Sequence, residues 1–187
     1  MATFISFQPN KFFNSTLYTG TGSSLGVTGV GFEPSLTWIK NRDVADFHVL
    51  TDAVRGDTKY LQSQTTTGST TNTESLKSFD SDGYTVGTMN EVNTNTEDYV
   101  SWNWRGGTST GIDLTAGTIT PSAYSISTTA GISILEYAGT GTASQTIAHG
   151  LGAVPKYIIF KRTDSTGSWP IYSIATGNTK ALYLDTS

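Results

Sequence analysis

One stretch of this chain occurs twice, and the duplication limits the folds available to it. Residues 29–61 recur at residues 150–182, a shift of 121 positions. The shared landmarks are Gly29, Gly31, Pro34, Lys40, Gly56 and Lys59, which match Gly150, Gly152, Pro155, Lys161, Gly177 and Lys180. Upstream, residues 18–22 resemble residues 137–141 at a shift of 119. One supersecondary unit has therefore been duplicated, with two extra residues in the second copy.

Each copy predicts a glycine turn followed by a strand. Gly-x-Gly-x-x-Pro supplies the turn and then a proline that fixes φ. The runs that follow, residues 36–40 and 156–161, are rich in aromatic and β-branched side chains and stop at charged residues. Both are shorter than the ten or so periodic residues typical of a helix. We expect each run to be a buried strand that opens into a polar loop.

Composition favours strands throughout the chain. There are 33 threonines and 20 glycines among the 187 residues, and only 14% of the residues are charged. Threonine is β-branched and favours strands over helices. Cysteine is absent, so disulfides and thiolate metal sites are excluded.

We predict an all-β fold of tandem β-sandwich repeats, of the jelly-roll or lectin-like kind. The expected parts are an N-terminal attachment arm at 1–17, a first repeat at 18–106, a Gly/Thr/Ser-rich linker at 107–131 and an incomplete second repeat at 132–187. The second copy has no counterpart of the segments near residues 80 and 102. Open sheet edges are rarely tolerated, so we expect either that the chain continues or that another chain supplies the missing strands.

The predicted arm is short but carries four aromatic anchors, Phe4, Phe7, Phe12 and Phe13. So many phenylalanines in so short a segment indicate that it packs on something. Two alternatives stay open: the arm covers its own domain, or it docks on a neighbouring subunit.

Charge excludes several partner classes. The net charge is −4, and the eleven lysines and arginines are scattered, whereas nucleic-acid affinity depends on concentrated positive charge. No apolar stretch approaches the roughly 18 residues that span a bilayer, and residues 1–10 do not resemble a secretory signal. We expect no nucleic-acid binding and no membrane insertion, and assembly in the cytoplasm.

Two local patterns predict structural turns. Asp52 precedes Arg55 and the Gly56 turn, and we interpret the two charges as an ion pair that holds this turn, the alternative being a ligand contact. Residues 76–86 predict a hairpin with Asp80 and Asp82 at its turn. The two aspartates resemble the start of a calcium loop, but its later ligands are missing, so a β-turn is favoured.

The most prominent aromatics lie in residues 99–105, which alternate strictly. Val100, Trp102 and Trp104 fall on one face of the expected strand, with Ser101 and Asn103 on the other. Indoles fill cores and also stack on sugar rings. Core filling is favoured because the tryptophans share the apolar face, and glycan binding through Trp102 and Trp104 is the alternative.

The sequence predicts no catalytic residue and no metal or cofactor site. The chain has only two histidines, His48 and His149, in unrelated repeat positions, and no serine beside a recognisable base. We expect His149 to hydrogen-bond to the backbone of its own glycine turn. His48 aligns with Trp169 of the second copy, so that position requires bulk rather than a titrating group.

The order of five motifs gives a family resemblance. They are residues 29–34 (Gly-Val-Gly-Phe-Glu-Pro), 38–42 (Trp-Ile-Lys-Asn-Arg), 52–56 (Asp-Ala-Val-Arg-Gly), 79–84 (Phe-Asp-Ser-Asp-Gly-Tyr) and 99–104 (Tyr-Val-Ser-Trp-Asn-Trp). Together they resemble a repeat of virion appendage proteins from tailed phages, especially phages of marine cyanobacteria and other aquatic bacteria. The resemblance implies a tail-fibre-like or other particle-surface protein with β-sandwich repeats, and it supplies no catalytic residues.

The resulting expectation is a non-enzymatic structural protein of a tailed-phage virion. It would contact other virion proteins and contribute to host adhesion. It would also self-associate, and a homotrimer is favoured because association covers the sheet edges. A lectin-like module that binds host cell-surface glycan is the alternative, and a polysaccharide-degrading enzyme of the tailspike kind is a third.

Overall fold

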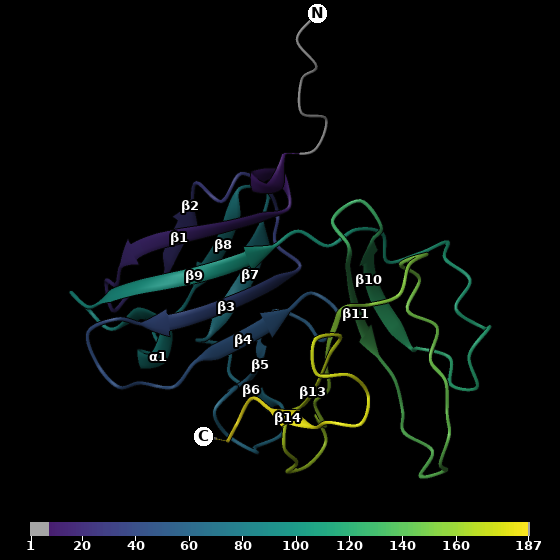
Figure 1. The fold of residues 1–187 in the computed structure, drawn as a ribbon. Helices are drawn as coiled ribbons and strands as arrows, with labels where there is room; N and C mark the ends of the chain where they lie inside the picture. Colours follow the sequence, from purple (N-terminus) through teal and green to yellow (C-terminus); the bar gives the residue numbers. More distant parts are fainter. Residues whose placement is uncertain (1–7, 187) are drawn as a thin grey trace, which may run out of the picture.

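Strands make up nearly all of the regular structure in residues 8–186, the part of the chain that the computed structural model describes (Figure 1). The largest sheet has six strands in the order β1 (Phe13–Thr19), β9 (Asp98–Trp104), β3 (Leu36–Asn41), β4 (Val49–Asp52), β5 (Lys59–Leu61) and β6 (Thr70–Thr71). A second sheet has the order β2 (Leu25–Thr28), β8 (Gly83–Val86) and β7 (Leu76–Asp80). All pairings are antiparallel. The predicted all-β fold class is confirmed.

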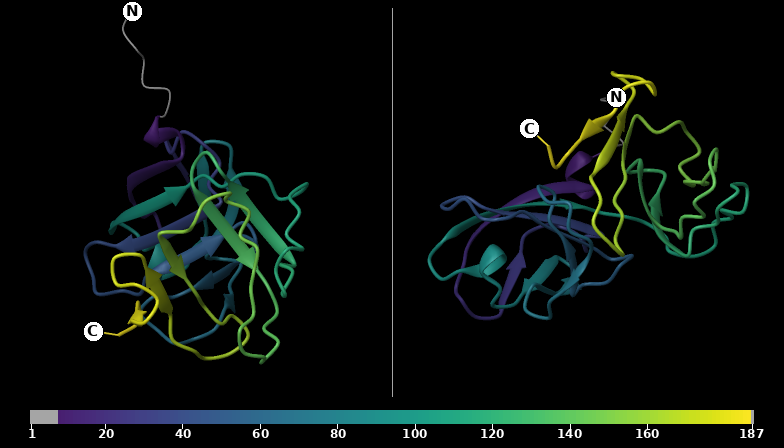
Figure 2. Two further views of the ribbon diagram at one scale, coloured as in Figure 1. Left: turned by 45° about the vertical axis from the view of Figure 1, so that its right-hand side comes forward. Right: turned by 90° about the horizontal axis from the view of Figure 1, so that it is seen from below.

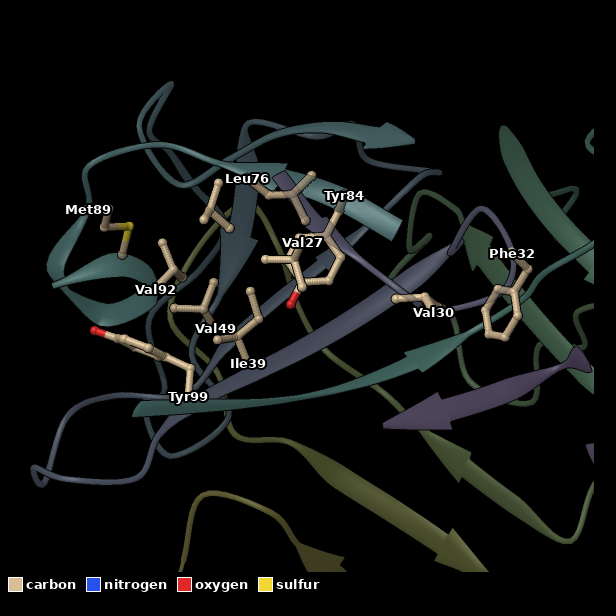
Figure 3. Close-up of a cluster of buried hydrophobic side chains, with 11 residues drawn as sticks. Val27, Val30, Phe32, Ile39, Val49, Leu76, Tyr84, Met89, Val92 and Tyr99 are labelled. Atoms are coloured by element: carbon tan, nitrogen blue, oxygen red, sulfur yellow. The ribbon is translucent and has the colours of Figure 1, made fainter. Parts of the chain in front are cut away.

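The core lies between these two sheets, where side chains from both converge (Figure 3). Ile39, Val49 and Tyr99 come from the six-stranded sheet, while Leu76 and Tyr84 come from the three-stranded one. Each is at most 1% exposed. Removing a side chain of this size from water contributes about 1.5–3 kcal/mol, so this cluster holds the sandwich together.

The short helix α1 (Asn90–Asn93) closes one end of the core and is fixed by a buried amide. The Asn93 side chain is fully buried; it donates to the Gly87 carbonyl at 2.7 Å and accepts from the Thr21 amide at 2.7 Å. The Tyr99 hydroxyl donates to the Asn90 carbonyl at 2.7 Å. Nothing in the polar run of residues 90–98 predicted this helix.

The predicted hairpin is confirmed, and its two aspartates act as turn residues. Strands β7 and β8 are joined by Ser81 and Asp82. The Asp82 carboxylate accepts from the Gly29 amide at 3.2 Å and the Gly31 amide at 2.6 Å, where φ is 84° and 87°. Asp80 accepts from two hydroxyl groups of its own hairpin. The aspartates therefore tie the hairpin to the first glycine turn.

The later part of the chain repeats the pairing of the first. A three-stranded sheet has the order β12 (Tyr157–Ile159), β13 (Pro170–Ser173) and β14 (Leu182–Tyr183). Leu36 pairs with Asp52 in the first sheet, and Tyr157 pairs with Ser173, each partner shifted by 121. The pairing of Leu50 with Leu61 between β4 and β5 recurs, at the same shift, as the pairing of Ile171 with Leu182 between β13 and β14. The common register supports the duplication inferred from the sequence.

One expectation for this region is wrong. Strand β12 forms at the predicted place but is not buried: Tyr157 is 55% and Ile159 40% exposed. Its counterpart β3 pairs with β9 on its other edge and contributes Ile39 to the core cluster, whereas β12 pairs with β13 only within residues 8–186.

Residues 13–17, expected as part of the arm, form most of β1 and pair with β9. The 3-10 helix η1 (Pro9–Lys11) precedes them. The expected linker contains β10 (Ala123–Ser127), which pairs with β11 (Ile132–Glu136). Figure 2 shows this green hairpin beside the first unit. The strand content arises because alternating apolar residues in both segments find a partner strand.

Candidate functional site

The face of strand β9 that packs on the core is not the predicted one but the opposite one. Ser101 and Asn103 are fully buried, whereas Trp102 and Trp104 are half-buried on the outer face of the six-stranded sheet. The buried polar pair is partly satisfied, because the Asn103 amide donates to the Ser101 hydroxyl at 2.9 Å. Strict alternation defines two faces but does not say which one a second sheet covers. The core-filling interpretation of the two tryptophans is therefore wrong.

Four aromatic side chains on that outer face form a continuous surface, called here the outer aromatic face: Phe13, Trp38, Trp102 and Trp104. Register places Phe13 opposite Trp104 and Trp38 opposite Trp102. The Phe13 and Trp104 ring centroids are 5.0 Å apart, and those of Trp38 and Trp102 are 6.2 Å apart. The rings are tilted rather than coplanar, at 51° and 75°. Phe13 and Trp38 were not predicted to belong to this face. The alternation along their own strands, β1 and β3, was the signal that could have placed them there.

The second unit covers one side of this face and leaves the other open. Trp169 is 3% exposed and packs with Leu50 and Leu61, against which Trp38 also lies. On the open side, Phe13 is 40% and Leu17 64% exposed. Exposed aromatic area beside a covered edge is typical of a recognition surface.

A cleft of about 540 Å³ lies next to the end of β9. Its lining residues include Phe12, Glu33, Ser35 and Arg105. Phe12 precedes Phe13, and Arg105 follows Trp104. Because successive residues of a strand point to opposite faces, this mostly polar cleft and the outer aromatic face lie on different sides of the sheet.

His48 bounds the covered side of the face through its contact with Trp38. The Trp38 Nε1–H donates to His48 Nδ1 at 2.8 Å, so that nitrogen carries no proton. Burial, and then the charge of Lys40, lower the pKa of His48 from its ordinary value of 6.5. His48 is thus held neutral as a hydrogen-bond acceptor.

We expect the protein to lose stability as the pH falls below 6.5. As the pH falls, His48 is protonated near pH 6.5 in the unfolded chain and only at a lower pH in the folded protein. The stabilisation is therefore complete above pH 6.5 and declines until the pH reaches the lowered pKa of the folded state. Urea unfolding at about pH 7.5 and about pH 5.5 measures the decline. His48→Gln keeps an acceptor for Trp38 and should flatten this dependence; an unchanged dependence in that variant would contradict the assignment.

Other predicted residues take structural positions. Arg55 Nε lies 2.6 Å from Asp52 Oδ2, with both side chains nearly buried, which confirms the predicted ion pair at the Gly56 turn. The Leu151 amide donates to His149 Nδ1 at 3.1 Å, which confirms the predicted turn contact. Phe4 and Phe7 lie outside the described residues.

Residues 8–186 offer neither a metal cluster nor a membrane-spanning helix. No group of three or more His, Asp or Glu side chains in this part of the chain is placed to hold a metal ion. Within the same residues, no helix is long and apolar enough to cross a membrane.

Comparison with known proteins gives a family without an assigned activity. No curated protein and no solved structure matches the chain. Residues 8–187 match the family described as Domain of unknown function (DUF7483), and the chain belongs to that family.

Proposed function

We propose that the protein is a non-enzymatic structural protein of a tailed-phage virion, part of a tail fibre or another surface appendage. The observation that carries the proposal is the recurrence of the β3–β4–β5 register in β12–β13–β14. A chain that repeats one strand-built unit suits an extended, projecting assembly. The order of motifs in the sequence points to the same class of protein.

Exposed edges and apolar side chains supply contacts for assembly on the particle. Strand β1 is an edge of the six-stranded sheet, and it exposes Phe13 and Leu17. A seven-residue edge of this kind pairs readily with another chain. We propose a homo-oligomer, with a trimer favoured, that also contacts other virion proteins after assembly in the host cytoplasm.

Labelling of intact particles tests the virion assignment. Antibodies raised against the purified chain should decorate one appendage of phage particles whose genome encodes it. Particles that carry no antigen, by electron microscopy and by immunoblot, would rule the assignment out. Light scattering on the purified chain then measures the oligomeric mass.

A second candidate function is glycan recognition, favoured by the outward orientation of Trp102 and Trp104. Sugar rings present apolar faces that stack on indoles, while their hydroxyl groups need polar partners. The outer aromatic face supplies the apolar partner for such a stack. Host adhesion through cell-surface glycan would fit the appendage role.

Replacing Trp102 and Trp104 together with alanine is expected to weaken glycan binding strongly without unfolding the protein. Each stacked ring contributes about 1 kcal/mol, so the affinity should fall roughly thirty-fold. Both side chains are half-buried, so most of the core is untouched. A glycan array and titration calorimetry measure the loss, and circular dichroism checks the fold.

A matched control is Tyr157→Ala, which removes an exposed aromatic ring from the second unit. Its glycan binding should equal that of the unaltered protein. Undiminished binding by the double tryptophan variant, or collapse of its fold, would reject the recognition site.

A further inference from the structure

The second unit has a place for a strand that no described strand fills. In the first unit, β9 lies between β1 and β3. The counterpart of β3 is β12, and within residues 8–186 β12 pairs with β13 only. The other edge of β12, equivalent to the edge of β3 that binds β9, is open.

The backbone of that edge is oriented to accept a strand. In the first unit the Ala53 amide donates to the Ser35 carbonyl at 2.9 Å, so this carbonyl points toward β4. The next residue, Leu36, therefore directs its backbone N–H and C=O groups to the other side, toward β9. The Ile174 amide donates to the Lys156 carbonyl at the same distance of 2.9 Å. By this equivalence Tyr157 and Ile159 direct their N–H and C=O groups to the open side.

The side chains around the open edge are apolar and exposed. Phe160 is 39% exposed, although its first-unit counterpart Ile39 is 1% exposed. Tyr157 and Ile159 are exposed as well, although the counterpart of Ile159, Trp38, packs against Trp102. The edge therefore offers both backbone hydrogen-bonding groups and apolar area to an added strand.

The N-terminus of the chain carries a segment with the pattern of β9. Residues 4–8 read Phe-Ile-Ser-Phe-Gln, and residues 99–103 of β9 read Tyr-Val-Ser-Trp-Asn. The two segments agree in class at five successive positions: aromatic, β-branched, serine, aromatic and amide. In the register of β9 on β3, the segment places Phe7 opposite Ile159, an aromatic and β-branched cross-strand pair.

The position of residues 8–12 favours a second copy as the source of this strand. Residue 8 is followed at once by η1, and the Arg105 amide donates to the Phe12 carbonyl at 2.8 Å, which fixes the start of β1 to the end of β9. The purple η1 lies at the opposite end of the molecule from the yellow sheet of β13 and β14 (Figures 1 and 2). The four peptide links from residue 8 to residue 12 span at most about 14 Å.

We propose that residues 2–8 of one copy add as a strand to the open edge of β12 in another copy, in the place that β9 occupies in the first unit. The proposal rests on the self-association in the proposed function and names its contact. The two surfaces joined are different, so the contact is head-to-tail and builds a closed ring, a trimer among them, or an open filament.

Removing residues 1–8 tests the proposal. The full chain should be oligomeric by light scattering, and the chain that begins at Pro9 should be monomeric. A synthetic peptide of residues 1–9 should bind the shortened chain one to one and slow amide hydrogen exchange at Tyr157, Ile159 and Lys161 by about ten-fold. The matched control is the same peptide with Phe4→Lys and Phe7→Lys, which should not bind.

Three results would overturn the proposal. The first is a shortened chain that keeps the oligomeric mass of the full chain; in that case particle labelling would still stand as a separate test of the virion role. The second is a peptide that leaves β12 exchange unchanged. The third is a monomeric full chain with a protected β12 edge, which would mean that the strand comes from within one copy.

Discussion

Gly83→Ala is expected to unfold the first unit. Gly83 has φ of 148°, and a Cβ atom there would lie 2.0 Å from the Val27 carbonyl oxygen. It sits in β8, the central strand of the three-stranded sheet, where it pairs with Thr28 and Asp80. Neither backbone can move without breaking this sheet, so we expect a loss of about 4 kcal/mol or more, a large part of the stability of a domain.

Urea unfolding followed by circular dichroism measures this loss. The matched control is Gly139→Ala, because Gly139 is exposed and a Cβ atom there meets nothing within 4 Å. The control should stay within about 0.5 kcal/mol of the unaltered protein. Equal stability of the two variants would show that the β2–β8 pairing is not as described.

Trp169→Ala is expected to release the second unit from the first. Trp169 packs on Leu50 and Leu61, and its Nε1–H donates to the Thr65 carbonyl at 2.9 Å. Truncating a buried tryptophan costs about 3–5 kcal/mol. Because the first-unit core is a separate cluster, the loss should fall on residues 150–186 and spare β3 and β9.

Hydrogen exchange read by mass spectrometry locates the effect of this substitution. Residues 150–186 should exchange rapidly in the Trp169→Ala variant, while β3 and β9 keep their protection. Trp169→Phe keeps one aromatic ring in the cluster and loses the N–H with the rest of the indole, so its effect should be smaller than that of Trp169→Ala, at about 1–2 kcal/mol. Unchanged protection of residues 150–186 in Trp169→Ala would show that other contacts hold the units together.

Local signals in the sequence were sufficient for individual strands and turns. The alternation of residues 99–105 and the Asp-Gly signal at Asp82–Gly83 act over a few residues, so β9 and the β7–β8 hairpin were predictable. The 121-residue shift also fixed which strands correspond. These features depend on neighbours in the chain and not on the rest of the fold.

Tertiary contacts determine the features that local sequence patterns did not predict. Trp102 and Trp104 have the apolar character of core residues, yet Ser101 and Asn103 face inward because Tyr84 and Leu76 already supply bulk from the opposing sheet. The polar segment of residues 62–74 contains no apolar side chain, yet its Thr65 carbonyl accepts the Trp169 N–H. The last contact joins residues 104 positions apart, and neither contact leaves a local signature in the sequence.

The position of β9 between β1 and β3 sets the order in which the first unit can fold. Thr19 pairs with Asp98 and Phe13 with Trp104, partners separated by 79 and 91 positions. Pairings this distant close large loops and form slowly. During synthesis β1 and β3 leave the ribosome long before the strand that joins them, so this sheet can be completed only after residue 104 has emerged. Until then the nascent chain displays two unpaired edges, which makes translation the period of greatest exposure to aggregation.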